Sequence, residues 1–269
     1  MVGSKLHQHA GWVAMRVPGM AARIGRFAAA SVVISAAGGT ASAQEYEWSF
    51  RVTPYLWLPT VSGDAEAGGG VPSIEFDTEI IGSLEFGALA TFEADYGPWG
   101  VLTDLIYVDL SAEAETPFGV LFSEVEGEFS GLIFSGYGGY RIIDEDWGGV
   151  QLLAGARAFS LDFEATLVSA LPAVPTLNGG ASETWVNPVA GARVTAFATD
   201  ELFGGVSADF GGWDGDLTWQ VVGLVGYQFD ETWDVRAGYR YMAVEHEFDG
   251  GANMDAAFQG PVIGVGISF

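Results

Sequence analysis

The segment that most narrowly limits the fold is the end of the chain, from Ala256 to Phe269. Apolar residues alternate there with mostly small ones, and this period of two is typical of a β-strand with one apolar face. An outer-membrane barrel closes with such a strand, turning the apolar face to lipid and the terminal aromatic to the interface. A soluble sheet has no reason to end on an apolar Phe. We therefore expect a barrel whose signal for the bacterial barrel-assembly machinery comprises Ile263, Val265, Ile267 and Phe269.

The N-terminus predicts export. Four basic residues precede a short apolar run at 27–37, and Ala41-Ser42-Ala43 provides the small-x-small cleavage pattern of a secretory signal peptide. We expect residues 1–43 to be the signal peptide and residues 44–269 to form one barrel domain. The apolar run is well short of the ~20 residues that a helical span needs, so a helical membrane protein is not expected.

Charge and composition narrow the partners of the mature chain. Removing residues 1–43 leaves 10 − 4 = 6 basic residues against all 35 acidic ones, a net charge of −29. Nucleic acid and anionic lipid are therefore poor partners, and the expected surroundings are outer-membrane lipid. The sequence contains no cysteine, so no disulfide can stabilise the fold, which must depend on its core and its strand ladders. No sequence feature indicates the oligomeric state.

Four short segments combine turn-forming residues with an aromatic, at 96–99, 144–147, 200–203 and 230–233. We predict that they are the tight periplasmic turns of the barrel, although ordinary soluble hairpins would show the same pattern. Their rings would then form an aromatic belt at the interface: Trp99, Trp147, Phe203 and Trp233. Longer, acidic connections are expected on the outer side, near 60–83, 113–127, 164–183, 212–216 and 248–255.

The segments between these turns and loops predict an all-β, antiparallel, up-and-down transmembrane barrel. Its ten expected strands are 46–59, 84–96, 100–112, 128–143, 148–163, 184–198, 202–212, 217–229, 234–247 and 256–269. An even number places both termini in the periplasm. Eight or twelve strands remain open, because 73–79 could add a strand and 203–211 is weak. Pro54, Pro188 and Pro261 would fall in the outer halves of their strands, where a ladder can end.

All six arginines of the mature chain lie inside predicted strands. Their neighbours of opposite parity are apolar, and a basic residue facing lipid at mid-membrane costs about 2–4 kcal/mol, so the arginines should point into the lumen. Acids of the same parity would pair with them. The predicted ion-paired core is Arg51, Arg141, Arg157, Arg193, Arg236, Arg240, Glu93 and Asp104, with further acids at Glu47, Glu85, Asp95 and Asp209. A soluble barrel with surface arginines is the alternative.

Aromatic side chains are also expected inside. Tyr55, Trp57, Tyr137 and Phe159 share the inward parity of the arginines. A ten-stranded barrel is only slightly wider than an eight-stranded one, whose interior side chains can fill it. We therefore expect a plugged lumen with at most a small, cation-preferring conductance.

The mature chain resembles a largely uncharacterised proteobacterial family of outer-membrane β-barrel proteins. The resemblance lies in the stretches 54–59, 97–100, 103–110, 185–188, 191–193, 216–220, 226–229 and 238–241, including Trp185-Val186-Asn187-Pro188 and Gly238-Tyr239-Arg240-Tyr241. Where the family runs Asp-x-Gly-Gly-Phe into a longer glycine-rich tip, this chain has a shortened loop at 209–215. The resemblance implies a barrel fold and an outer-membrane location, but no ligand or active site.

Candidate chemistry is sparse. His246, the single histidine of the mature chain, lies near the predicted outer mouth without a recognisable partner, so we expect an incidental polar residue rather than the general base of a surface hydrolase. Acidic clusters suited to hard cations lie at Glu124/Glu126/Glu128, Asp162/Glu164 and Glu245/Glu247/Asp249. No motif predicts a catalytic site, a cofactor or a bound metal. A non-enzymatic structural protein or narrow passive channel is the leading hypothesis; a surface hydrolase and a loop-mediated, cation-dependent binding protein are the alternatives.

Overall fold

The computed structural model describes residues 46–66, 74–79, 84–115, 122–169, 176–248 and 252–269. The predicted signal peptide, residues 1–43, lies outside these residues and stays a prediction. Every regular element in the described part is a strand, and no helix there has the length and apolarity needed to span a bilayer.

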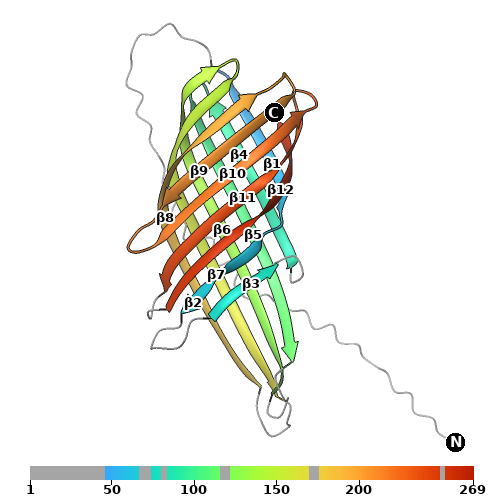
Figure 1. Ribbon diagram of the computed structural model, residues 1–269, viewed down its shortest axis with the longest axis vertical. Helices are drawn as coiled ribbons and strands as arrows, with labels where there is room; N and C mark the ends of the chain where they lie inside the picture. The colour runs from blue at the N-terminus through green and yellow to red at the C-terminus, as the bar shows by residue number, and fades with distance from the viewer. Residues whose placement is uncertain (1–45, 67–73, 80–83, 116–121, 170–175, 249–251) are drawn as a thin grey trace, which may run out of the picture. The chain divides into compact units, whose positions relative to one another are not determined.

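The strands form one antiparallel sheet of 12 that closes on itself (Figure 1). Their bounds are β1 Trp48–Trp57, β2 Thr60–Glu66, β3 Ile74–Glu79, β4 Leu84–Tyr96, β5 Trp99–Glu115, β6 Phe122–Glu145, β7 Gly148–Ser169, β8 Leu177–Phe197, β9 Leu202–Gly211, β10 Leu217–Gln228, β11 Trp233–Phe248 and β12 Ala252–Ser268. Consecutive strands from β4 to β12 pair with one another, and β1 closes the ring between β12 and β4. Ten strands therefore make the barrel, as predicted, and β2 and β3 are additions to it.

Short turns gather at one end of the barrel, here named the turn end; the opposite end is the loop end. The connections at 97–98, 146–147, 198–201 and 229–232 join successive strands at the turn end, where Phe50 and the terminal Phe269 also exchange two backbone hydrogen bonds. Both ends of the barrel domain thus meet there, which an even strand number requires.

The loop end differs from the prediction. Strands β5 to β8 continue far into the segments expected to be loops, since β6 starts at Phe122 and β7 ends at Ser169. Of the five predicted long connections, only 212–216 lies wholly in described residues as a turn. The residues that flank the other loops do alternate between the two faces of the sheet, but their acidic side chains led us to expect loops there. Figure 1 shows the start of β6 and the end of β7 reaching well beyond the short β9–β10 turn at the loop end.

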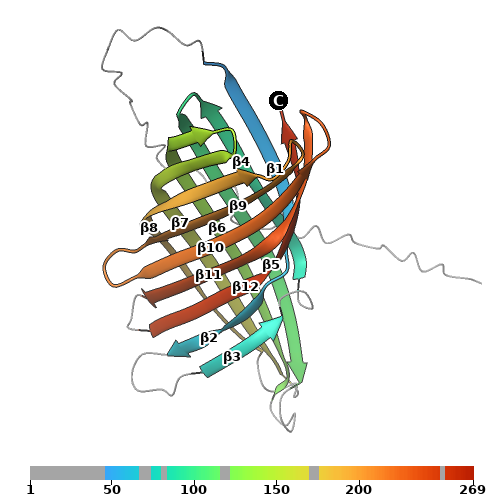
Figure 2. The ribbon, with the colours of Figure 1, turned by 45° about the horizontal axis from the view of Figure 1, so that its top comes forward.

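Strands β1 and β2 act as one interrupted strand. They keep a single register along β12, from Arg51↔Ser268 through Trp57↔Val262 to Thr60↔Gln259. On the other edge the partner changes: β1 pairs with β4 only as far as Pro54, and β2 pairs with β3 instead (Figure 2). Proline has no N–H to donate, so a ladder readily ends there.

Prolines at the other two predicted positions follow the same rule. The β8–β9 ladder ends at Val189↔Gly211, directly beside Pro188. Pro261 lies next to Val262, where the β1–β12 ladder stops before it resumes with β2. The sheet thus accommodates each proline at the end of a ladder.

Alternation along the strands separates an apolar outside from a mixed interior. Large apolar residues face outward in every long strand, and exposed rings surround the turn end, including Trp48, Tyr96, Trp99, Trp147, Trp233 and Phe269. Phe203 does not join them, which corrects its predicted place in the belt. It has the same parity as the buried Asp209 on β9, and its ring lies inside against the Arg236 guanidinium at 5.5 Å.

Candidate functional site

The lumen is the candidate site, and its polar side chains fall into two groups. The first, named the turn-end cluster, comprises Arg51, Glu93, Arg193, Asp234 and Arg236. Glu93 on β4 accepts a hydrogen bond from Arg193 Nη1 on β8 at 2.5 Å and lies 3.5 Å from Arg236 Nη1. Asp234 accepts two bonds from Arg236, at 2.6 and 3.2 Å, and lies 3.5 Å from Arg51 Nε. Two carboxylates thus neutralise most of the charge of three guanidinium groups.

The second group, named the mid-lumen network, contains two buried ion pairs. The Arg157 side chain is 0% exposed; its Nη2 lies 2.8 Å from Asp209 Oδ1, and its other donors reach the hydroxyls of Ser135, Tyr137 and Thr218. All three nitrogens of this buried guanidinium therefore donate hydrogen bonds, which offsets the cost of burying its charge.

Arg240 forms the other pair of the network. Its Nη2 lies 2.7 Å from Asp104 Oδ2, which belongs to β5, and its Nη1 donates to the Tyr55 hydroxyl at 3.0 Å. Tyr55 in turn donates to Asp104 at 2.6 Å. Gln220 links the two pairs, because its carbonyl oxygen accepts from Arg240 at 2.6 Å and its amide nitrogen donates to Asp209 at 2.7 Å.

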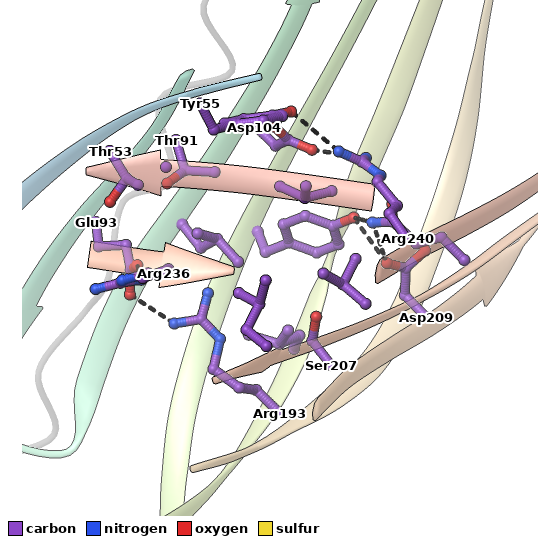
Figure 3. A pocket seen from close by; sticks show the side chains of 18 residues that line it. Thr53, Tyr55, Thr91, Glu93, Asp104, Arg193, Ser207, Asp209, Arg236 and Arg240 are labelled. Carbon is purple, nitrogen blue, oxygen red and sulfur yellow. Dashed lines mark hydrogen bonds and ion pairs between the residues drawn. The ribbon is translucent and has the colours of Figure 1, made fainter. Parts of the chain in front are cut away.

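A cavity of about 100 Å³ separates the two groups. Figure 3 shows Glu93, Arg193 and Arg236 on one side of it and Tyr55, Asp104 and Arg240 on another. Its lining mixes polar side chains with apolar ones such as Leu102, Leu153 and Val222. The polar members offer hydrogen-bond partners to water, and several water-sized volumes fit.

Above the mid-lumen network, toward the loop end, the interior becomes apolar. The loop-end apolar layer is built on buried Trp57, Ile106, Phe159, Trp185, Met242 and Val244. Phe159 and Trp185 stack with centroids 4.7 Å apart, and Trp57 covers the Arg240 guanidinium at 4.9 Å. Trp57 thus lies between the mid-lumen network and the loop-end apolar layer. The face of its indole ring attracts the Arg240 cation, and its edges pack against hydrocarbon.

His246 has a partner, contrary to the prediction. Its Nδ1 lies 2.9 Å from Asp216 Oδ1, and its ring stacks on Trp185 at 3.8 Å. The β10–β11 register runs through Leu217↔Glu245, so continuing it by one residue places Asp216 opposite His246. Counting back from the turn at 229–232 would have found this pair in the sequence.

The structure places the predicted lumen residues as follows. All six arginines carry the inward parity, with Arg141 at the turn end, 3.2 Å from the exposed Asp144 and 3.7 Å from Asp95. Asp209 is buried, whereas Glu47 is exposed ahead of β1, and the Glu85 side chain lies outside the described residues. The polar partners that the sequence interpretation missed are Asp234, Gln220, Ser135 and Thr218. Each of these residues lies an even number of positions from an inward arginine or acid on or next to its own strand, so its side chain also faces the lumen.

The predicted acidic clusters show no metal geometry in the part of the chain that is described. Within that part, no three His, Cys, Asp or Glu side chains gather closely enough to hold an ion. Asp249 and the Glu124 side chain lie outside it.

Comparisons with known proteins support the fold. No family model matches the chain, and no curated protein matches it in sequence. It is similar in structure to the outer membrane protease OmpT from Escherichia coli, with a TM-score of 0.56 and 12% identity over 86% of this chain and 99% of that one. Weaker similarities involve the transport unit of the autotransporter AIDA-I from Escherichia coli (TM-score 0.40, 8% identity, 87% and 92% covered) and Ail from Yersinia pestis (0.33, 13%, 82% and 98%).

Only the first of these scores is high enough to support a conclusion, and at this identity it concerns the fold alone. The resemblance to a proteobacterial family stays an expectation. The chain has the closed, antiparallel fold of an outer-membrane β-barrel.

Proposed function

We propose that the mature chain is an integral outer-membrane barrel without enzymatic activity, serving as a structural protein or at most a narrow passive channel. Its fold, its apolar outer face and the aromatic belt at the turn end support the location. The turn end would face the periplasm and the long β5–β8 strands would project outside. Exposed acids such as Glu126 and Glu164 on those projecting parts would then be solvated rather than in lipid.

The observation that carries the proposal is that charged side chains bridge the lumen. Glu93 and Arg193 belong to β4 and β8, with β5, β6 and β7 between them in the ring. Asp104 and Arg240 belong to β5 and β11, which are equally far apart in the ring. A pair that spans nearly the full width of a ten-stranded ring blocks the passage at that level.

Planar-bilayer recording tests this closure. Purified protein should show at most a small, cation-preferring conductance, since the acidic residues at the loop end would repel anions from the mouth of the barrel. A large and stable porin-like conductance would contradict a closed lumen.

Cell fractionation tests the location separately. The mature protein should appear in the outer-membrane fraction, require detergent for extraction and change its gel mobility on heating. Recovery as a soluble periplasmic monomer would instead favour a soluble, lipocalin-like barrel.

A second candidate, a surface hydrolase, rests on the His246–Asp216 contact at 2.9 Å. A carboxylate on one imidazole nitrogen is the arrangement that orients a general base. However, the His246 side chain is only 6% exposed, and its Nε2 is buried without a hydrogen-bond partner. The His246→Ala variant should therefore leave peptide and lipid hydrolysis at background; loss of a real activity from a folded variant would promote this candidate.

A further inference from the structure

The barrel wall is incompletely hydrogen-bonded on one side of the loop end. Strand β4 pairs with β1 only from Tyr96 down to Ala90, so residues 84–89 have no ladder partner on that edge among the described residues. Strand β3, which pairs only with β2 there, leaves its far edge unpaired as well. An unpaired stretch at membrane depth is costly unless water, lipid headgroups or other polar atoms hydrogen-bond to it. This side is therefore the weakest seam of the wall.

An apolar pocket of about 80 Å³ lies beside this seam. Its lining includes Trp57, Leu89, Ile106, Leu161 and Phe258, with Leu58 and Pro59 from the link between β1 and β2. Charged side chains do not contribute to it. The volume is about half that of an engineered apolar cavity of roughly 150 Å³ that binds benzene. A short stretch of hydrocarbon fits, and a folded polar ligand does not.

Two glycines create this room. Gly87, Val108, Gly131 and Leu161 are successive cross-strand partners on β4, β5, β6 and β7, so small and large residues alternate along one level. A Cβ on Gly131 would lie 3.1 Å from the Phe129 ring and 3.4 Å from Val108. The pocket therefore depends on the absence of side chains at these inward positions.

The pocket reaches the outer face of the barrel. Leu58 directly follows β1 and keeps the outward parity of Leu56; it is 42% exposed, yet it lines the pocket. It follows Trp48 of the aromatic belt by ten residues. A strand tilted by ~40° rises about 25 Å over that length at ~3.3 Å per residue, which matches the height of the apolar band. The opening is thus level with the outer edge of the hydrocarbon.

We propose that the barrel takes the acyl chain of an outer-leaflet lipid through the seam between β1 and β4 into the loop-end apolar pocket. An inserted chain would cover the apolar lining of the pocket and remove it from water. The occupant comes from the membrane because the opening faces lipid, whereas the ion-bridged lumen blocks entry from the turn end. The proposal rests on the membrane location but does not depend on whether the lumen conducts.

Photo-crosslinking in liposomes tests it. The folded protein is reconstituted with a phospholipid carrying a diazirine near the end of one acyl chain, and labelled peptides are mapped by mass spectrometry. Inward residues of the pocket, above all Ile133, Leu161 and Phe258, should be labelled as strongly as outward Leu132 or Phe134. A free fatty acid with the same diazirine serves as the second probe.

Two variants fill the pocket, and one provides the control. Gly131→Val and Leu161→Trp should each lower inward labelling at least fivefold, while outward labelling stays constant. Gly136→Val adds the same atoms on the outward row of β6, where a Cβ meets only ordinary contacts at 3.5 Å, and should change nothing inside. A heat-modifiable gel shift checks that each protein is folded.

Three outcomes would overturn the proposal: inward labelling no greater than that of lumen residues at the turn end, unchanged labelling in a folded pocket-filling variant, or labelling by the free fatty acid alone. Protein that never enters the liposomes would refute the membrane location instead, and flotation detects that case.

Discussion

The mid-lumen network and the loop-end apolar layer lie on either side of the Trp57–Arg240 contact at 4.9 Å, and they fill the same barrel in opposite ways. In the network, ion pairs and hydrogen bonds hold each charged group, although the buried Nε of Arg240 has no hydrogen-bond partner. Removing one member of a pair therefore leaves the other charge buried without its counter-ion. In the apolar layer, packing is non-directional, and a pocket of about 80 Å³ remains. Both kinds of filling leave space, about 100 Å³ between the polar groups and about 80 Å³ in the apolar layer. Polar side chains can share their space with water, whereas the apolar pocket suits only another apolar group.

Removing the most buried charge should have the largest effect. The Arg157→Ala variant leaves Asp209 without its cation and should cost roughly 3–5 kcal/mol of unfolding free energy, since breaking a buried pair exposes its partner to the full desolvation penalty. Urea unfolding of the detergent-folded protein measures this. A variant as stable as its parent would show that the network is not what holds the middle of the barrel.

Truncating the apolar layer should cost somewhat less. Phe159 is 2% exposed and stacked on Trp185, so Phe159→Ala should lose about 3 kcal/mol, at the low end for a buried ring because the site already borders a pocket. Bilayer conductance should stay at the parental level, as the ion bridges below remain intact. An increase would mean that the apolar layer also seals the lumen.

The Arg193→Ala variant separates closure from stability. Its side chain is 24% exposed, and Glu93 would keep Arg236 at 3.5 Å, so we expect a loss of about 1–3 kcal/mol. Conductance should rise and become more cation-selective, because one lumen bridge and one positive charge are gone. Unchanged conductance together with parental stability would contradict the ion-bridged lumen.

The smallest effect is expected at the turn-end mouth. The Arg141→Ala variant removes contacts to Asp144 and Asp95 that are partly solvated, and its unfolding free energy should change by no more than about 0.5 kcal/mol. It is the matched control for the buried arginines. A large loss of unfolding free energy in this variant would mean that the contribution of a lumen arginine to stability does not depend on its burial.

Sequence reasoning reached the strands, the ring of ten and the inward side of every arginine, because alternation with period two and the cost of a charge in lipid are local rules. The same parity rule, applied along β9 and β11, would have placed Phe203 inside and found Asp234. The flanks of the loops were misjudged, since acidic residues indicate solvent exposure but do not exclude strand pairing above a membrane.

What the sequence by itself determined is therefore which side chains face the lumen. Only the closed ring decided which of them meet: Arg193 and Glu93 are 100 residues apart in the chain, and Arg240 and Tyr55 are 185 apart. Pro54 marks in the sequence where the ladder with β4 ends, but only the folded sheet shows that β2 continues the strand and takes β3 as its partner. Pairing across a ring depends on its strand number, tilt and stagger together, and no local pattern of residues encodes those quantities.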